Sequence, residues 1–212
     1  MSRTLLFALI LAIVSATAAE AAAITCTPPP GFVDSPHPDI APAGDLVSHT
    51  EEIVIERPLP VVVKSLDRPI EDTVHQTSSL PGVAGDYLLT RGEFGAPGSR
   101  RLNCLSDGST LVEQVLERDA RADAFRFRYV VWNYTTEKAR PIVYGVGDFH
   151  YTAIARDRTH VTWTYAFQLN RHRFPGALGS FGDFLFRVGF LDRQYADLMR
   201  TTLDGIRTTA ER

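Results

Sequence analysis

Glu113 stands in the sequence context that suggests chemistry most directly. It lies in LVEQVL, two residues from both Leu111 and Val115, so the three side chains share one face of an extended chain. If that apolar face points into the protein, the carboxylate points inward too, and burial of an unpaired carboxylate is costly. Two interpretations stay open: a polar anchor for a molecule held in a cavity, or a structural pair with a nearby arginine or tyrosine.

Asp148 and His150 are the second candidate for chemistry. Residues two apart on a strand share a face, so the carboxylate could orient the imidazole for acid-base catalysis, together with Glu113 and a tyrosine. The same spacing equally fits a hydrogen-bonded pair on the protein surface.

The sequence carries no further catalytic or metal-binding pattern. Its six histidines include no HxH or HExxH pair, its two cysteines lack zinc-ligand spacing, and no GxSxG turn occurs. The stretch GVGDF lacks the additional glycine and the lysine of a phosphate-binding loop. We therefore assign no catalytic residue, and we expect neither a metal nor a cofactor.

The stretch AFRFRYVVW places aromatic side chains on one side of an extended chain. Arg126 and Arg128 fall on the other side, where we expect them to face solvent. Tyr151, Trp163 and Tyr165 lie on other predicted strands, and their hydroxyl or indole groups need partners when they are buried. These aromatic side chains either line a pocket or form an ordinary core.

Alternating apolar segments separated by turn residues predict the elements that position these side chains. Their spacing indicates an antiparallel meander. Residues 58–68 can form a short helix, because prolines stand at its start. The predicted strands cover residues 46–56, 86–94, 100–105, 110–119, 124–132, 144–155 and 159–169.

The C-terminal part has helical periodicity instead. From about Ser180, apolar residues recur at gaps of three and four and form one stripe on a helix of nearly 30 residues. A lone helix must bury such a stripe, and the sheet is the large apolar partner available. The stripe consists of Phe181, Phe184, Leu185, Val188, Leu191, Tyr195, Leu198 and Ile206.

Residues 1–23 read as a secretory signal peptide. Arg3 precedes the apolar run LLFALILAIVSA, and small residues follow that allow cleavage after Ala18 or Ala23. An uncleaved anchor is the alternative. No later segment is long and apolar enough to span a bilayer. We therefore expect export, to a periplasm or outright secretion.

Residues 24–44 are proline-rich and lack periodicity, and we interpret them as a linker before a domain at 45–212. Cys26 lies in this segment and Cys104 in the domain. In an oxidising compartment the two could form a disulfide, but two cysteines alone do not establish one.

Composition excludes one class of partner. The chain has a formal net charge of −3, and its arginines are scattered rather than clustered in a basic stripe. Nucleic-acid binding requires such a stripe. We expect no nucleic-acid partner.

Five segments in order carry a resemblance to a known superfamily: LPGV, GEFGAPGSRRLNCLSDG, EQVLERD, FRFRYVV and HVTWTYAF, followed by the long helix. Residues 45–207 resemble the START-like superfamily, also called the polyketide cyclase or Bet v 1-like group. The resemblance implies an α+β helix-grip fold. In it, a seven-stranded antiparallel sheet curls around the C-terminal helix and leaves an internal cavity.

The resemblance further implies binding or carriage of a hydrophobic small molecule, such as a lipid, sterol, isoprenoid or polyketide-like compound. A cyclase or dehydratase, and an envelope protein-interaction module with a filled cavity, are the alternatives. We expect residues 106–109 and 133–141 to gate the cavity. The expected ligand contacts are Glu113, Phe127, Tyr129, Tyr151, Trp163, Tyr165, Phe167, Phe184, Val188 and Leu191.

Overall fold

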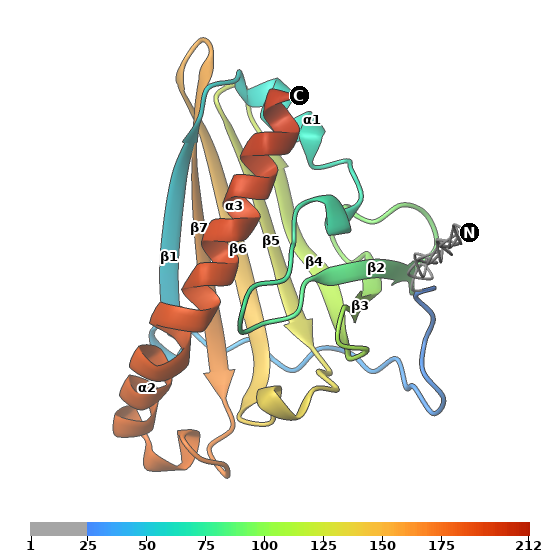
Figure 1. The fold of residues 1–212 in the computed structure, drawn as a ribbon, viewed down its shortest axis with the longest axis vertical. Coiled ribbons are helices and arrows are strands. Elements are labelled where there is room, and N and C mark those ends of the chain that lie inside the picture. Colours follow the sequence, from blue (N-terminus) through green and yellow to red (C-terminus); the bar gives the residue numbers. More distant parts are fainter. Residues whose placement is uncertain (1–24) are drawn as a thin grey trace, which may run out of the picture.

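Seven strands form one antiparallel sheet in the computed structural model, which describes residues 25–212 (Figure 1). Strands β2 to β7 follow one another as a meander, and β1 pairs with β7 at the far edge, in the order β1-β7-β6-β5-β4-β3-β2. The predicted sheet is therefore confirmed. The strands are β1 (Val47–Ile55), β2 (Val83–Leu88), β3 (Arg100–Leu105), β4 (Thr110–Ala120), β5 (Ala124–Trp132), β6 (Ile142–Ala155) and β7 (Arg158–Leu169).

The second strand is the one whose bounds differ most from the sequence prediction. It ends at Leu88, whereas the prediction extended to Phe94. The reason is local, because Gly92, Gly95 and Gly98 all adopt positive φ angles that turn the chain into a loop.

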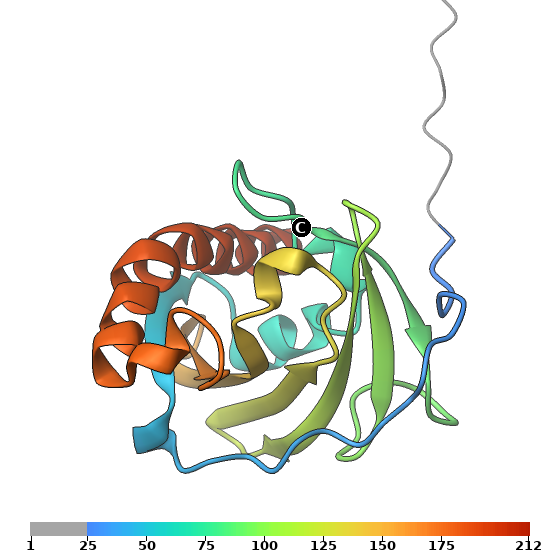
Figure 2. The same ribbon diagram turned by 90° about the horizontal axis from the view of Figure 1, so that it is seen from below.

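One helix of 32 residues closes the fold at the C-terminus. It comprises α2 (Ser180–Phe186), a wide-turned π-helical segment (Arg187–Tyr195) and α3 (Ala196–Glu211). Figure 2 shows this helix lying along the inside of the curled sheet. The short helix α1 (Leu59–Ser65) connects β1 to the segment before β2 and packs on α3. Within residues 25–212, no helix is both long and apolar enough to span a membrane.

The core lies between the concave face of the sheet and the helix. Strand β7 alternates strictly, so that Trp163, Tyr165 and Phe167 point inward, and Met199 and Leu203 of α3 are buried against this face. Phe125, Tyr129 and Val131 also belong to this inner core. Arg126 and Arg128 project from the opposite face, as the alternation in AFRFRYVVW predicts.

The first half of the long helix differs from its predicted stripe. Phe186 and Leu191 are buried, whereas Phe181, Phe184 and Val188 are exposed. The π-helical segment explains the difference. Its turns close from residue i to i+5 rather than i+4, so an apolar stripe spaced for 3.6 residues per turn changes face across it.

The proline-rich segment lies along the outer face of the sheet, in contrast to the expected linker. Cys26, Phe32 and Ile40 pack on a second apolar cluster that includes Leu102 and Val130. The segment is also held by a disulfide between Cys26 and Cys104, by an ion pair between Asp34 and Arg100, and by a hydrogen bond from the Ala41 amide to the Tyr144 hydroxyl. We call residues 25–42 the strap.

Gly145 and Gly147 of β6 make room for two inward-pointing tyrosines. A Cβ at Gly147 would lie 2.2 Å from Cζ of Tyr129, and a Cβ at Gly145 would lie 2.5 Å from Cε1 of Tyr165. Real Cβ atoms do not approach carbon this closely. The stretch GVGDF therefore has a packing role, because its glycines leave the space that the two rings fill.

Candidate functional site

A cavity of about 530 Å³ opens between the sheet, α3 and the segment that follows α1. Its volume falls within the range of small-molecule sites. Its interior is lined by Phe125, Phe127, Tyr129, Phe149, Tyr151, Trp163, Thr202 and Ile206.

Five of the ten predicted ligand contacts line this cavity. They are Glu113 from β4, Phe127 and Tyr129 from β5, Tyr151 from β6, and Trp163 from β7. Since β4 to β7 are neighbours in the sheet, the meander brings these inward-pointing side chains together. Whether they contact a ligand stays a prediction.

The other five predicted contacts lie outside the cavity. Tyr165, Phe167 and Leu191 are buried in the core, where Phe167 packs against Phe186, Phe190 and Tyr195 of the long helix. Phe184 and Val188 are exposed because the π-helical segment turns them away from the sheet. The structure thus corrects the predicted position of these helix residues.

Glu113 is buried and paired. Arg101 donates from Nε to Glu113 Oε2 at 2.9 Å, and Asn103 donates to the same oxygen at 2.8 Å. The Arg101 guanidinium also stacks on the Phe94 ring, with its central carbon 3.9 Å from the ring centroid. Of the two interpretations of Glu113, the structural pair with an arginine is therefore present, and the paired carboxylate lies in the cavity wall.

Two buried polar groups in the cavity wall lack a well-aligned partner. Neither Trp163 Nε1 nor Thr202 Oγ1 makes a well-aligned hydrogen bond within residues 25–212, although both side chains are buried; the Tyr129 hydroxyl lies near the indole nitrogen. An unsatisfied buried donor is costly, and native proteins rarely leave one without a ligand or water. Both groups belong to residues that line the cavity, so an occupant that reaches them would supply the missing partner.

Thr202 is the functional candidate that the sequence analysis missed. It follows Met199 by three residues and precedes Ile206 by four, so it lies on the buried stripe of α3. The signal in the sequence is a threonine at a position of the apolar helix stripe. The stripe was defined from apolar residues alone, so Thr202 was not included.

Burial perturbs the tyrosines around the cavity and the adjoining core. It raises the pKa of Tyr129 well above the ordinary value, and the negative charge of Glu113 raises it further. Burial raises the pKa of Tyr134, Tyr165 and Tyr195 in the same direction. These tyrosines stay protonated near neutrality, so none of them supplies a phenolate base.

The mouth of the cavity is formed by two segments with charged side chains. Asp67 and Glu71 come from the segment that follows α1, and Glu93 comes from the loop between β2 and β3. The segments expected to gate the cavity, 106–109 and 133–141, do not line it. The reason is that the sheet curls so that the β2–β3 loop, rather than these connections, faces α1 across the opening.

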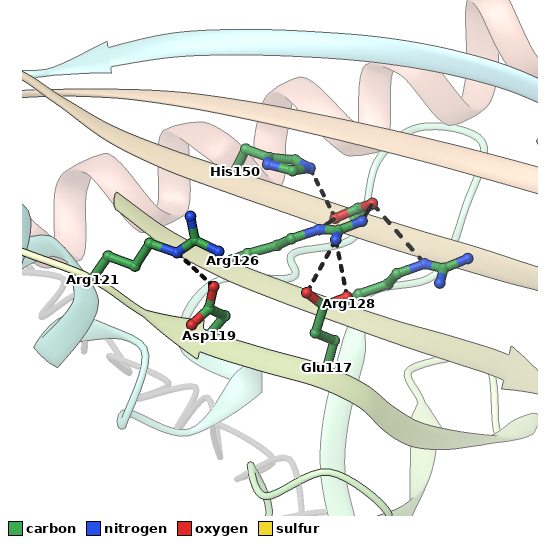
Figure 3. Close-up of polar contacts among 7 residues, drawn as sticks. Glu117, Asp119, Arg121, Arg126, Arg128 and His150 are labelled. Carbon is green, nitrogen blue, oxygen red and sulfur yellow. Dashed lines mark hydrogen bonds and ion pairs between the residues drawn. The ribbon is translucent and has the colours of Figure 1, made fainter. Parts of the chain in front are cut away.

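Asp148 and His150 belong to the outer face. His150 Nε2 lies 3.1 Å from Asp148, whose carboxylate also accepts from Arg126 at 2.7 Å, and Arg126 bridges further to Glu117 (Figure 3). His150 is half exposed and is separated from Glu113 by the sheet. The surface pair of Asp148 and His150 is confirmed. Glu113 and His150 lie on opposite faces of the sheet and therefore cannot act on one substrate.

Metal ligation finds no support in the described part of the chain. Among residues 25–212, no three histidine, cysteine, aspartate or glutamate side chains are grouped so that they could hold a metal ion.

Comparisons with known proteins address the fold. No protein-family model matches the chain, and no curated protein sequence is significantly similar to it. Solved structures do match. The Zhui aromatase/cyclase from Streptomyces sp. R1128 has a TM-score of 0.52 at 15% identity, covering 79% of this chain and 94% of that one.

Two further structures show the same architecture. A START superfamily protein from Mycobacterium smegmatis has a TM-score of 0.52 at 9% identity, covering 77% of this chain and 97% of that one. Ara h 8.0201 has a TM-score of 0.53 at 12% identity, covering 78% and 97%. The chain therefore shares the helix-grip fold with these structures.

Proposed function

We propose that this protein binds an uncharged, mostly apolar small molecule in the cavity between the sheet and the C-terminal helix. The observation that carries the proposal is a cavity with an aromatic inner wall and a charged mouth, two of whose lining residues, Trp163 and Thr202, have buried polar groups without a well-aligned partner. An indole nitrogen only donates, so the matching ligand atom is an acceptor, such as a carbonyl or hydroxyl oxygen.

The charges of the cavity wall favour a neutral ligand. Two arginines line the cavity beside its aromatic side chains. Arg101 is committed to Glu113 and stacked on Phe94. Arg118 lies over the Phe125 ring and pairs with Asp67 at 3.8 Å. A ligand carboxylate would meet the Glu113 carboxylate, and it would have to compete with Glu113 and Asp67 for the two arginines, so its burial would be costly. A ketone, ester or alcohol avoids this cost.

We further propose that the protein works after export, in a periplasm or outside the cell, as a carrier. The support is the N-terminal sequence of residues 1–23, which lie outside the described residues, together with the pairing of Cys26 and Cys104. Disulfides persist in oxidising compartments and are rare in the cytosol.

The two alternatives have weaker support. An enzyme using Glu113 and His150 would need both on one side of the sheet, and they lie on opposite sides. An interaction module would have side chains filling the space beside Trp163, where the cavity lies instead.

Solvent extraction of protein purified from its native source, followed by mass spectrometry, tests the proposal. We expect a stoichiometric neutral compound that contains at least one oxygen. Thr202→Leu should lose this compound by narrowing the cavity. Thr209→Leu should retain it, because Thr209 is buried on the same helix outside the cavity. The proposal would be contradicted if the unmodified protein released no more compound than the Thr202→Leu variant does, or if the only compound released were an acid.

A further inference from the structure

Large apolar side chains gather on the surface at one end of the molecule. Five such residues between positions 174 and 188 are 36% to 70% exposed, and they include every exposed phenylalanine among residues 25–212. Clustered exposure of this kind marks an interaction site, whereas single exposed apolar residues are ordinary. We call this set the aromatic patch, and it consists of Phe174, Leu178, Phe181, Phe184 and Val188.

The backbone under the aromatic patch is closely packed. Phe181, Phe184 and Val188 share one helix face at spacings of three and four. The preceding loop sits directly on α2, since a Cβ at Gly182 would lie 1.9 Å from the Pro175 carbonyl oxygen. The patch is thus presented by a supported surface and not by a loose loop.

The segment that carries the aromatic patch has an excess of arginine over acidic residues. Residues 171–188 contain three arginines and one histidine but a single aspartate, in a chain whose net charge is −3. The aspartate, Asp183, is neutralised by Arg171, which contacts both of its oxygens at 2.6 and 3.1 Å. Arg173 and Arg187 make no ion pair with any described residue, although Asp45 lines the same surface hollow as Arg187.

We propose that the aromatic patch docks on an anionic membrane surface. Exposed phenylalanine and leucine side chains enter the boundary between headgroups and acyl chains, while arginines around them attract anionic headgroups. A second copy of the chain fits less well, because a two-fold contact through the patch would place the same arginines against each other. The patch and the C-terminus lie at opposite ends of the long helix (Figure 1). Ile206, which lines the cavity, is near the C-terminal end, so the patch is not part of the cavity wall.

Vesicle flotation tests the proposal directly. The protein should begin at residue 24, since the apolar run in residues 1–23 could bind vesicles by itself, and every described strand and helix lies between residues 43 and 211. We expect binding to phosphatidylglycerol–phosphatidylcholine vesicles that weakens at least fivefold on vesicles of phosphatidylcholine alone. Salt at about 1 M, where the Debye length is about 3 Å, should weaken it similarly.

Matched variants separate the patch from general hydrophobicity. Phe181→Ser with Phe184→Ser should reduce the bound fraction at least tenfold. Val61→Ser with Ile154→Ser should leave it unchanged, because these two residues are similarly exposed on α1 and near the β6–β7 turn, away from the patch. Arg173→Gln with Arg187→Gln should remove the preference for anionic vesicles.

Three results would overturn the proposal. The first is no flotation with any vesicle, and the second is equal loss in both serine double variants. The third is that the protein is a dimer in solution, that the variant with Phe181→Ser and Phe184→Ser is a monomer, and that neither binds vesicles. That result would assign the patch to a contact with a second copy.

Discussion

Trp163 and Thr202 define the chemistry of the cavity at the scale of single residues. Each has a buried polar group without a well-aligned partner, and both residues line the same cavity. Burial without a hydrogen bond costs stability in the empty protein, and a ligand oxygen would recover that cost. The argument predicts opposite effects of one substitution on stability and on binding.

Thr202→Val should leave the free energy of unfolding of the empty protein unchanged or raise it by up to about 1 kcal/mol, because it replaces an unsatisfied hydroxyl with a methyl group. It should weaken binding of benzophenone about tenfold and leave binding of diphenylmethane, which lacks the carbonyl, unchanged. Thr209→Val is the control. Isothermal titration and urea unfolding measure both quantities, and equal losses for the two ligands would contradict the hydrogen-bonding role.

Glu113→Gln should destabilise the protein strongly. The substitution leaves the largely buried Arg101 guanidinium without its carboxylate, and breaking one partner of such a pair costs about 2 to 3 kcal/mol. Urea unfolding checks the value. Replacing both partners, as Arg101→Met with Glu113→Leu, should recover most of the loss. Failure of the double variant to recover would show that Glu113 has a role beyond this pair.

At the scale of elements, the alternation of β7 and of AFRFRYVVW could be predicted because period-two patterning depends only on which residues are apolar. Three of the five cavity-lining contacts, Phe127, Tyr129 and Trp163, follow from these two strands, and Glu113 and Tyr151 follow from the same patterning of β4 and β6. The stripe on the first half of the C-terminal helix could not be predicted, because the π-helical turns between Arg187 and Tyr195 leave no local signature. As a result Phe186 is buried in the core, and Phe184, which the stripe predicted there, is exposed.

The strap shows a second limit of sequence reasoning. Its prolines and lack of periodicity correctly exclude a helix or strand, but irregular chain can still pack. Phe32 and Ile40 bury apolar surface on the outer sheet, and no local pattern indicates that surface as their partner. Long-range pairing, including that of Cys26 with Cys104, is a property of the whole fold.

Strand β6 depends on its two glycines. Gly147→Ala should lower the free energy of unfolding by about 1 to 3 kcal/mol, because its Cβ would overlap the Tyr129 ring. Gly189→Ala is the matched control, since nothing lies within 4 Å of its Cβ and alanine favours the helix. Thermal unfolding compares the two. A neutral Gly147→Ala would contradict the packing role of the GVG stretch.

At the scale of the whole molecule, the buried tyrosines link stability to alkaline pH. Burial raises the folded-state pKa of Tyr129, Tyr134, Tyr151, Tyr165 and Tyr195 above the ordinary value of 10. The folded protein therefore holds these protons more tightly than the unfolded chain does. Their contribution to stability is complete below pH 10 and is lost as the pH rises beyond it.

Each of these tyrosines should remove about 1.4 kcal/mol of stability per pH unit above 10. Together they outweigh a typical unfolding free energy of about 5 to 15 kcal/mol within roughly one to two pH units. Absorbance at the phenolate band should thus rise together with loss of circular dichroism. Ionisation of all tyrosines near pH 10 in a protein that stays folded would contradict their burial.

The most direct test of a ligand site beside Trp163 is a nitrogen–proton correlation spectrum, because the chain has two tryptophans and hence two indole signals. Trp132 lies on the outer face beside His37 and serves as an internal control. Addition of benzophenone should move the Trp163 signal downfield and leave the Trp132 signal in place, and diphenylmethane should move the Trp163 signal much less. If neither indole responds, or if Trp132 moves while Trp163 does not, the cavity is not the binding site.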